Sequence, residues 1–202
     1  MSNQTAKKTY ALREVWLIRH GETAWSLSGQ HTGRTDIALT DRGREQARAL
    51  APVLAAQPFD AVLSSPMIRA TDTCRLAGLG DRMIEMHDLH EWDYGIYEGR
   101  TTAEIHATTP DWSVWHSPIP DGENLEQIQL RVQSVVERLL TMTGRVAVFS
   151  HAHCLRALAG FWMSGEAALG AHLYLDTASV SVLGFDHEDR AIRRWNMRLD
   201  LS

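Results

Sequence analysis

Three short apolar runs in this chain each end in polar residues that can carry chemistry. The runs span residues 14–18, 61–63 and 145–149, and none of them alternates between apolar and polar side chains. A run without alternation is typical of a central strand that is covered on both faces, as in parallel sheets. The pattern therefore predicts a largely parallel sheet buried between helices.

Helical periodicity separates these runs. From Thr40 to Gln57 apolar side chains recur at helical spacing, with Thr40 as the N-cap, and Pro52 disfavours the second half of that helix. Further helices are expected at 67–76, 125–142 and 155–163, a weaker strand at 83–86, and a closing hairpin of strands at 180–185 and 191–195. Strands that alternate with helices predict an α/β fold of three layers, α/β/α, with a mostly parallel central sheet.

A segment at about 90–124 departs from this alternation. It is irregular and rich in Trp, Gly and Pro, with one short helix expected near 102–107. We interpret it as a small cap insertion over a site. Globular domains contain about 100–200 residues, so the chain, residues 1–202, is expected to form a single domain.

Charge and cysteine content disfavour several classes of partner. The chain has 20 Lys and Arg against 25 Asp and Glu, a formal net charge of −5, which argues against binding nucleic acid. No apolar run approaches the roughly 18 residues needed to cross a bilayer, so no membrane partner is expected. Two cysteines cannot build a disulfide framework, and a reducing, cytoplasmic location is the simpler expectation.

Two arginines and two histidines follow the three predicted strands. Arg19 and His20 follow the first strand, Arg69 comes shortly after the second, and His151 follows the third. In a parallel sheet ligands bind beyond the carboxyl ends of the strands, so these side chains are expected to share one pocket. Arginine binds phosphate oxygens through its planar fork, and a neutral histidine is a good nucleophile toward phosphorus. The residues predict phosphoryl chemistry that requires neither a metal nor a cofactor.

Such chemistry also needs a proton donor for the leaving alcohol. Glu91 and Asp93 flank Trp92 in the expected cap. An apolar neighbour favours the protonated form of a carboxyl, so both acids are candidates.

Further motifs surround these residues in a characteristic order. After Arg19-His20-Gly21 come segments 30–36, 39–43, 64–70, 91–99 and 150–151, which span nearly the whole chain. This order resembles the histidine phosphatase superfamily, the phosphoglycerate mutase-like proteins. Within it the chain looks most like the short acid-phosphatase-like members and the sedoheptulose-1,7-bisphosphatase-like branch. The resemblance implies a phosphoglycerate mutase-like fold and a phosphoric monoester hydrolase.

The resemblance also implies roles for individual residues. His20 would accept the phosphoryl group, with Arg19, Arg69 and His151 clamping it. Glu91 would protonate the leaving oxygen and then act as base toward water. The expected substrate-binding residues are Gly21, Ser26, Thr32, Gly33, Ala152, His153 and Glu123. Ser26 stands where many relatives carry Asn, and Ala152 replaces the Gly that commonly follows the second histidine.

The expected function is hydrolysis of phosphomonoesters of small metabolites, sugar phosphates above all, through a phosphohistidine. Between Glu91 and Glu123 the only Lys or Arg is Arg100. Mutases that resemble this chain carry a longer insertion there, with extra basic residues that hold the substrate carboxylate. The alternatives are a phosphoglycerate mutase dependent on 2,3-bisphosphoglycerate and a non-catalytic protein that binds a phosphorylated ligand. Family habit suggests a homodimer.

Two other patterns in the sequence could indicate a metal site or a cysteine-based phosphatase. His151 and His153 have the spacing of some metal ligands, but no matching carboxylate motif accompanies them, so His153 is interpreted as a substrate-side or supporting residue. Neither Cys74 nor Cys154 begins a Cys-x5-Arg loop, which argues against a thiolate phosphatase.

Overall fold

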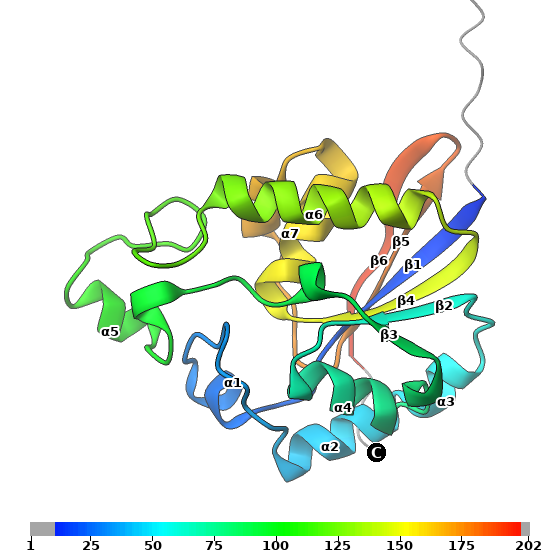
Figure 1. The fold of residues 1–202 in the computed structure, drawn as a ribbon, viewed down its shortest axis with the longest axis horizontal. Coiled ribbons are helices and arrows are strands. Elements are labelled where there is room, and N and C mark those ends of the chain that lie inside the picture. Colours follow the sequence, from blue (N-terminus) through cyan, green and yellow to red (C-terminus); the bar gives the residue numbers. More distant parts are fainter. Residues whose placement is uncertain (1–10, 199–202) are drawn as a thin grey trace, which may run out of the picture.

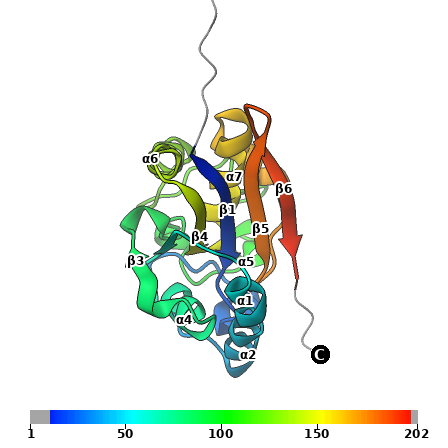
Figure 2. The same ribbon diagram turned by 90° about the vertical axis from the view of Figure 1, so that its right-hand side faces the viewer.

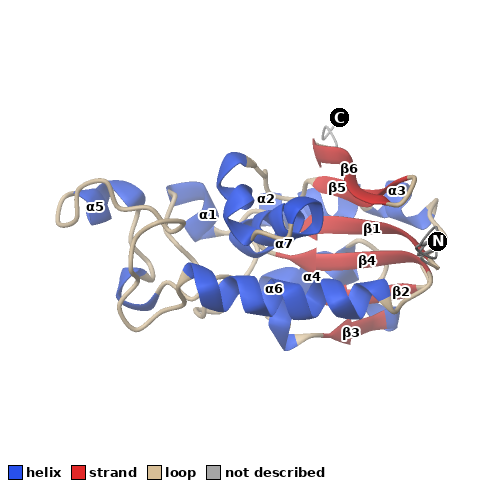
Figure 3. Ribbon diagram, turned by 90° about the horizontal axis from the view of Figure 1, so that it is seen from above, coloured by secondary structure: helices blue, strands red, loops and turns tan. Residues whose placement is uncertain are grey.

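A six-stranded sheet forms the centre of the computed structural model, which describes residues 11–198. The strands are β1 (Leu12–Arg19), β2 (Ala61–Ser64), β3 (Met83–Glu85), β4 (Gly144–Ser150), β5 (Val180–Asp186) and β6 (Asp189–Met197). Their order across the sheet is β3-β2-β4-β1-β5-β6 (Figure 3), and Figure 2 shows β5 and β6 at one side of it. The pairs from β3 to β1 are parallel, and β5 and β6 add two antiparallel pairs. The predicted α/β fold with a mostly parallel sheet is confirmed.

Helices cover both faces of this sheet (Figures 1 and 3). One face carries α2 (Asp41–Ala49), α3 (Ala51–Ala55) and α4 (Ile68–Leu76), and the other carries α6 (Leu125–Leu140) and α7 (Ala152–Ser164). Two short helices, α1 (Ala24–Ser28) and α5 (Thr102–His106), lie beyond one end of the sheet. Four 3-10 turns complete the described chain: η1 (Gly80–Arg82), η2 (His87–Leu89), η3 (Gly95–Tyr97) and η4 (Ala167–His172).

Strand β1 shows why the first apolar run lacks alternation. Val15 and Leu17 pack into the apolar cluster on the α6 and α7 face, whereas Trp16 and Ile18 pack into the cluster on the opposite face. Successive side chains of a strand point to opposite faces, so a strand covered by helices on both sides needs apolar residues at every position.

The helix predicted from Thr40 to Gln57 is wrong as a single element. Thr40 is the N-cap of α2, because its side chain accepts a hydrogen bond from the Gly43 amide. However, the helix is interrupted at Leu50, and α3 begins with Pro52 in its first turn. Proline has no N–H and its ring clashes with a carbonyl one turn earlier, so it kinks or breaks a helix. Helix α1 was not predicted; it starts at a capping box formed by Thr23 and Ser26.

The segment predicted as a cap packs into the same apolar cluster as β1, α6 and α7. Its buried side chains include Trp92, Ile105, Trp112 and Trp115. The expected short helix is present as α5. This shared packing is consistent with our proposal that the chain is one domain with a cap insertion at about 90–124. Within residues 11–198 no helix is both long and apolar enough to cross a membrane.

Candidate active site

The carboxyl ends of β1, β4 and β2 meet at one edge of the sheet, and each is followed by a predicted site residue. His20 follows β1, His151 follows β4, and Arg69 lies in the first turn of α4, after β2. The rings of His20 and His151 have their centroids 5.2 Å apart. Because β4 lies between β1 and β2, the topology brings residues from distant parts of the sequence into contact.

His20 is held in one tautomer. Its Nδ1 lies 2.7 Å from the carbonyl oxygen of Gly21, and since a carbonyl only accepts, Nδ1 carries the proton. The neutral ring therefore keeps a lone pair on Nε2. Burial, together with the charges of Arg69 and Arg19, lowers the pKa of His20 well below its ordinary value. At neutral pH Nε2 is therefore an unprotonated nitrogen nucleophile among positive charges.

Arg69 is fully buried and binds four acceptors. Its Nη1 donates to the carbonyl of Thr35 at 3.0 Å, and Nη2 donates to the carbonyls of Thr32 at 3.2 Å and Gly33 at 2.9 Å. Its Nε donates to Nδ1 of His151 at 3.0 Å. The guanidinium thus fixes the 32–35 loop while it places a positive charge beside both histidines.

The contact with Arg69 determines the tautomer of His151. Nδ1 accepts the Arg69 proton, so the ring proton is on Nε2, which donates to Oγ of Ser65 at 2.8 Å. Burial, followed by the charge of Arg69, lowers the pKa of His151 well below its ordinary value. His151 is therefore a neutral hydrogen-bond donor in this structure.

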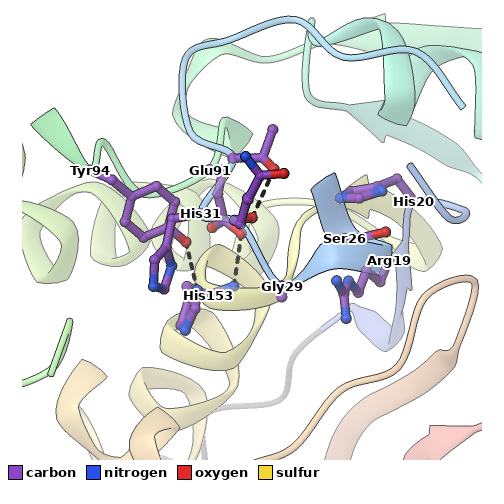
Figure 4. Close-up of a pocket in the computed structure, with 11 residues that line it drawn as sticks. Arg19, His20, Ser26, Gly29, His31, Glu91, Tyr94 and His153 are labelled. Atoms are coloured by element: carbon purple, nitrogen blue, oxygen red, sulfur yellow. Dashed lines mark hydrogen bonds between the residues drawn. The ribbon is translucent and has the colours of Figure 1, made fainter. Parts of the chain in front are cut away.

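A pocket of about 170 Å³ opens beside His20 (Figure 4). Eleven residues line it: Arg19, His20, Ser26, Gly29, Gln30, His31, Thr32, Glu91, Tyr94, Ala152 and His153. Arg19 donates from Nη1 to the carbonyl of Leu175 at 2.5 Å, but its buried Nε has no partner among residues 11–198. Arg69 and His151 are fully buried beside His20 and are not on the pocket wall.

The side chain of Glu91 lies against the N-terminus of α7. Its Oε1 accepts from the amides of Trp92 at 2.9 Å and Cys154 at 2.8 Å, and its Oε2 accepts from the amide of His153 at 3.0 Å. The Trp92 ring packs edge-on against Trp115 and donates to the carbonyl of Glu123. The Glu91 carboxylate faces backbone amides at the positive end of a helix.

Asp93, the other candidate acid, lies outside the pocket lining. One carboxylate oxygen pairs with Nε of Arg34 at 3.1 Å, and the other accepts from the amide of Gly95 at 3.0 Å. Of the two acids only Glu91 reaches the cavity, so geometry favours it as the proton donor.

The predicted substrate-binding residues fall into two groups. Ser26, Thr32, Ala152 and His153 line the pocket, whereas Gly21, Gly33 and Glu123 do not. The Ser26 hydroxyl is already engaged with Thr23 in the capping box of α1.

Each of the three residues outside the pocket has another partner. The Gly33 amide, expected to contact substrate, donates to the carboxylate of Glu98 at 2.8 Å. Gly21 permits a close approach, since a Cβ there would lie 2.4 Å from the carbonyl oxygen of Gly43. Glu123 is paired with Arg131.

His153 belongs to the wall opposite His20, with His31 and Tyr94 (Figure 4). The hydroxyl of Tyr94 and Nδ1 of His153 are 2.6 Å apart. Burial, reinforced by Glu91, raises the pKa of Tyr94 well above its ordinary value, so the phenol keeps its proton next to this nitrogen. Residues 11–198 contain no group of three His, Cys, Asp or Glu side chains placed to hold a metal ion.

Sequence reasoning missed Arg131, which supports the site from α6. A signal was present, because Arg131 lies three residues after Ile128 and four before Val135, on the face of α6 that the apolar pattern buries. A charged residue on a buried helical face requires partners. His31 and Tyr94 also line the pocket.

Comparison with known proteins was consistent over nearly the whole chain. Residues 15–198 match the histidine phosphatase superfamily (branch 1). An acid phosphatase of Mycobacterium tuberculosis is 42% identical over 180 residues, covering 87% of this chain and 88% of that protein. The sedoheptulose 1,7-bisphosphatase of Saccharomyces cerevisiae is 34% identical over 178 residues, which cover 72% of this chain and 66% of that protein. The solved structure of the product of the open reading frame Rv3214 from M. tuberculosis superposes with a TM-score of 0.86 at 38% identity. The match covers 93% of this chain and 99% of that one.

Proposed function

Because this chain belongs to the histidine phosphatase superfamily (branch 1), we propose that it hydrolyses phosphomonoesters of small metabolites, with sugar phosphates as the principal class. The relatives named acid phosphatase and sedoheptulose 1,7-bisphosphatase support hydrolysis of such esters. In this proposal His20 carries the phosphoryl group between two half-reactions, and no metal takes part.

The tautomer of His20 carries the proposal. The Gly21 carbonyl holds the proton on Nδ1, so Nε2 has a free lone pair beside the buried charges of Arg19 and Arg69. A nucleophile toward a phosphate ester needs an available electron pair and nearby positive charge to receive the developing negative charge. His20 has both.

In the first half-reaction the Nε2 lone pair forms a bond to phosphorus. The bond from phosphorus to the ester oxygen breaks, and that oxygen takes the electron pair together with a proton from the carboxyl of Glu91. Arg19 and Arg69 offset the charge on the phosphoryl oxygens. The ring of His151 lies 5.2 Å from that of His20, between centroids, and its Nε2–H donates to the Ser65 hydroxyl.

In the second half-reaction a water molecule attacks the phosphohistidine. Glu91, now a carboxylate, takes a proton from the water as the oxygen bonds to phosphorus. The bond from phosphorus to Nε2 breaks and the electron pair returns to the ring. The net result is one alcohol and one inorganic phosphate, with His20 and Glu91 restored.

The experiment is hydrolysis of p-nitrophenyl phosphate in the presence of EDTA. We expect turnover to survive chelation, His20→Ala to abolish it, and micromolar vanadate to inhibit, because vanadate adopts the geometry of the transferring group. His187→Asn is the matched control, since that imidazole is 93% exposed on the hairpin turn. Turnover by His20→Ala at the wild-type rate would refute the mechanism.

A second assay separates hydrolysis from the alternatives. A phosphoglycerate mutase would interconvert phosphoglycerates only when 2,3-bisphosphoglycerate is added, and a binding protein would retain phosphorylated ligands without releasing phosphate. We expect phosphate release from a panel of sugar phosphates without any added bisphosphate. Trapping during turnover should yield an acid-labile phosphoramidate at residue 20.

A further inference from the structure

A buried ion pair lies behind Glu91 and outside the pocket. Arg131 of α6 and Glu123 of the cap form two hydrogen bonds, from Nε to Oε1 at 2.8 Å and from Nη2 to Oε2 at 2.7 Å. Their side chains are 9% and 15% exposed. Although burial alone would raise the pKa of Glu123, hydrogen bonding to Arg131 lowers it, so the pair is ionic.

Both partners also bind the chain segment that carries Glu91. Nη1 of Arg131 donates to the carbonyls of Asp88 at 2.8 Å and His90 at 2.7 Å, and Nη2 approaches the carbonyl of Glu91 at 3.4 Å. One residue of the cap and one of α6 therefore converge on the backbone next to the proposed acid.

Glu123 holds the other side of the same segment. Its Oε2 accepts from the amide of Asp93 at 2.9 Å, and its carbonyl accepts from the indole of Trp92 at 2.7 Å. The ion pair is thus bonded to the backbone before, at and after Glu91. The Glu91 carboxylate itself accepts from the amides of α7, so the ion pair holds the backbone and α7 holds the side-chain end.

Stability alone is a weak reason for such an arrangement. A buried ion pair often contributes little net stability relative to apolar residues of the same volume, because both charges lose their hydration. Its fork geometry does supply direction: five N–H groups in a plane locate several acceptors relative to one another. Position is what a general acid requires, since proton transfer depends on hydrogen-bond reach.

We propose that Arg131 and Glu123 are positioning residues that hold Glu91 within reach of the leaving-group oxygen. This inference rests on the proposed function, in which Glu91 protonates that oxygen. Neither residue touches substrate, and both act through the backbone of residues 88–93.

Leaving groups of different basicity test this role. A p-nitrophenolate ion departs without a proton, whereas the alkoxide of glycerol phosphate needs one. Loss of proton donation should therefore slow glycerol phosphate hydrolysis and leave p-nitrophenyl phosphate almost unaffected. The ratio of the two kcat/KM values is independent of the fraction of enzyme that is folded, so a purely structural defect does not change it.

The variants are Arg131→Lys, which keeps the charge but loses the fork, and Glu123→Gln. We expect each to lower the ratio of glycerol phosphate to p-nitrophenyl phosphate activity by about 10-fold to 100-fold, because general acid catalysis contributes roughly 10²–10⁴-fold. Glu91→Gln should lower the same ratio at least as much. Arg145→Lys is the matched control: Arg145 pairs with Glu14 at 2.7 Å, beside the amino end of β1, and its substitution should leave the ratio unchanged.

The outcomes distinguish the two proposals. If the wild-type protein releases no phosphate from either ester, or if Glu91→Gln leaves the ratio unchanged, the proposed function or its acid is wrong. If Glu91→Gln lowers the ratio but Arg131→Lys and Glu123→Gln do not, the positioning role is wrong. A fall in all three variants, but not in Arg145→Lys, supports it.

Discussion

His31 in the pocket wall couples the stability of this protein to pH. Its ring packs 4.7 Å from the ring of Tyr94 and 5.2 Å from that of Trp112, and its Nε2 is 3.2 Å from the hydroxyl of Thr102. Burial lowers the pKa of His31 from 6.5 to about 4. The folded state therefore resists a proton that the unfolded chain accepts.

The sign and size of the effect follow from this difference. Above pH 6.5 both states are neutral at His31, and its contribution to stability is fully present. As the pH falls below that value only the unfolded chain takes up the proton, so stability is lost until the folded ring also titrates near pH 4. pH 5 lies about 1.5 pH units below the unfolded-state pKa of 6.5. At roughly 1.36 kcal/mol per unit, the stability lost by that pH is about 2 kcal/mol.

The measurement is urea denaturation of the wild-type protein and His31→Asn at pH 7.5 and pH 5. The other histidines are common to both proteins and cancel in the comparison. We expect the free energy of unfolding to fall between the two pH values by about 2 kcal/mol less in His31→Asn than in the wild type. His187→Asn, at an exposed position, should show the wild-type fall. An equal fall in His31→Asn and the wild type would refute the reasoning.

Three further predictions concern the charges, contacts and thiols of the site. Arg19→Gln removes one of the charges that lower the pKa of His20, so an NMR titration should show that pKa rising toward 6.5; an unchanged titration would contradict this. Gly43→Ala places a Cβ 2.1 Å from the carbonyl oxygen of Glu22, and urea denaturation should show a loss of about 1–3 kcal/mol, whereas no loss would mean that this contact relaxes freely. Burial raises the pKa of Cys154 to about 11, so Ellman's reagent should label it only after unfolding; rapid labelling of the native protein would show that the thiol is accessible.

The convergence of His20, Arg69 and His151 could be predicted from sequence, and the reason is geometric. Each follows a strand predicted to be parallel, and the carboxyl ends of parallel strands share one edge of a sheet. Strand positions were also predictable, because β1 and β4 are covered on both faces and so appear as unbroken apolar runs. These features can be read from short stretches of sequence, without knowing which distant residues they contact.

Partners of individual polar groups could not be predicted. The Gly33 amide is bonded to Glu98, and the environment of Glu91 is made of α7 amides rather than indole. These bonds join residues far apart in sequence through backbone atoms, which carry no residue-specific signal. Glu123 was expected at the substrate, and only the position of Arg131 on the buried face of α6 hinted at another role.

The two imidazoles reach each other because β1 and β4, which are more than a hundred residues apart in the sequence, are direct neighbours in the sheet. Under the proposed function, a chain emerging from the ribosome has no complete site until its second histidine has been synthesised and the central strand pair has formed. Truncated or half-made copies would be inert toward the metabolite pool. Phosphate release during translation or refolding should therefore begin no earlier than the moment at which the middle of the sheet is completed.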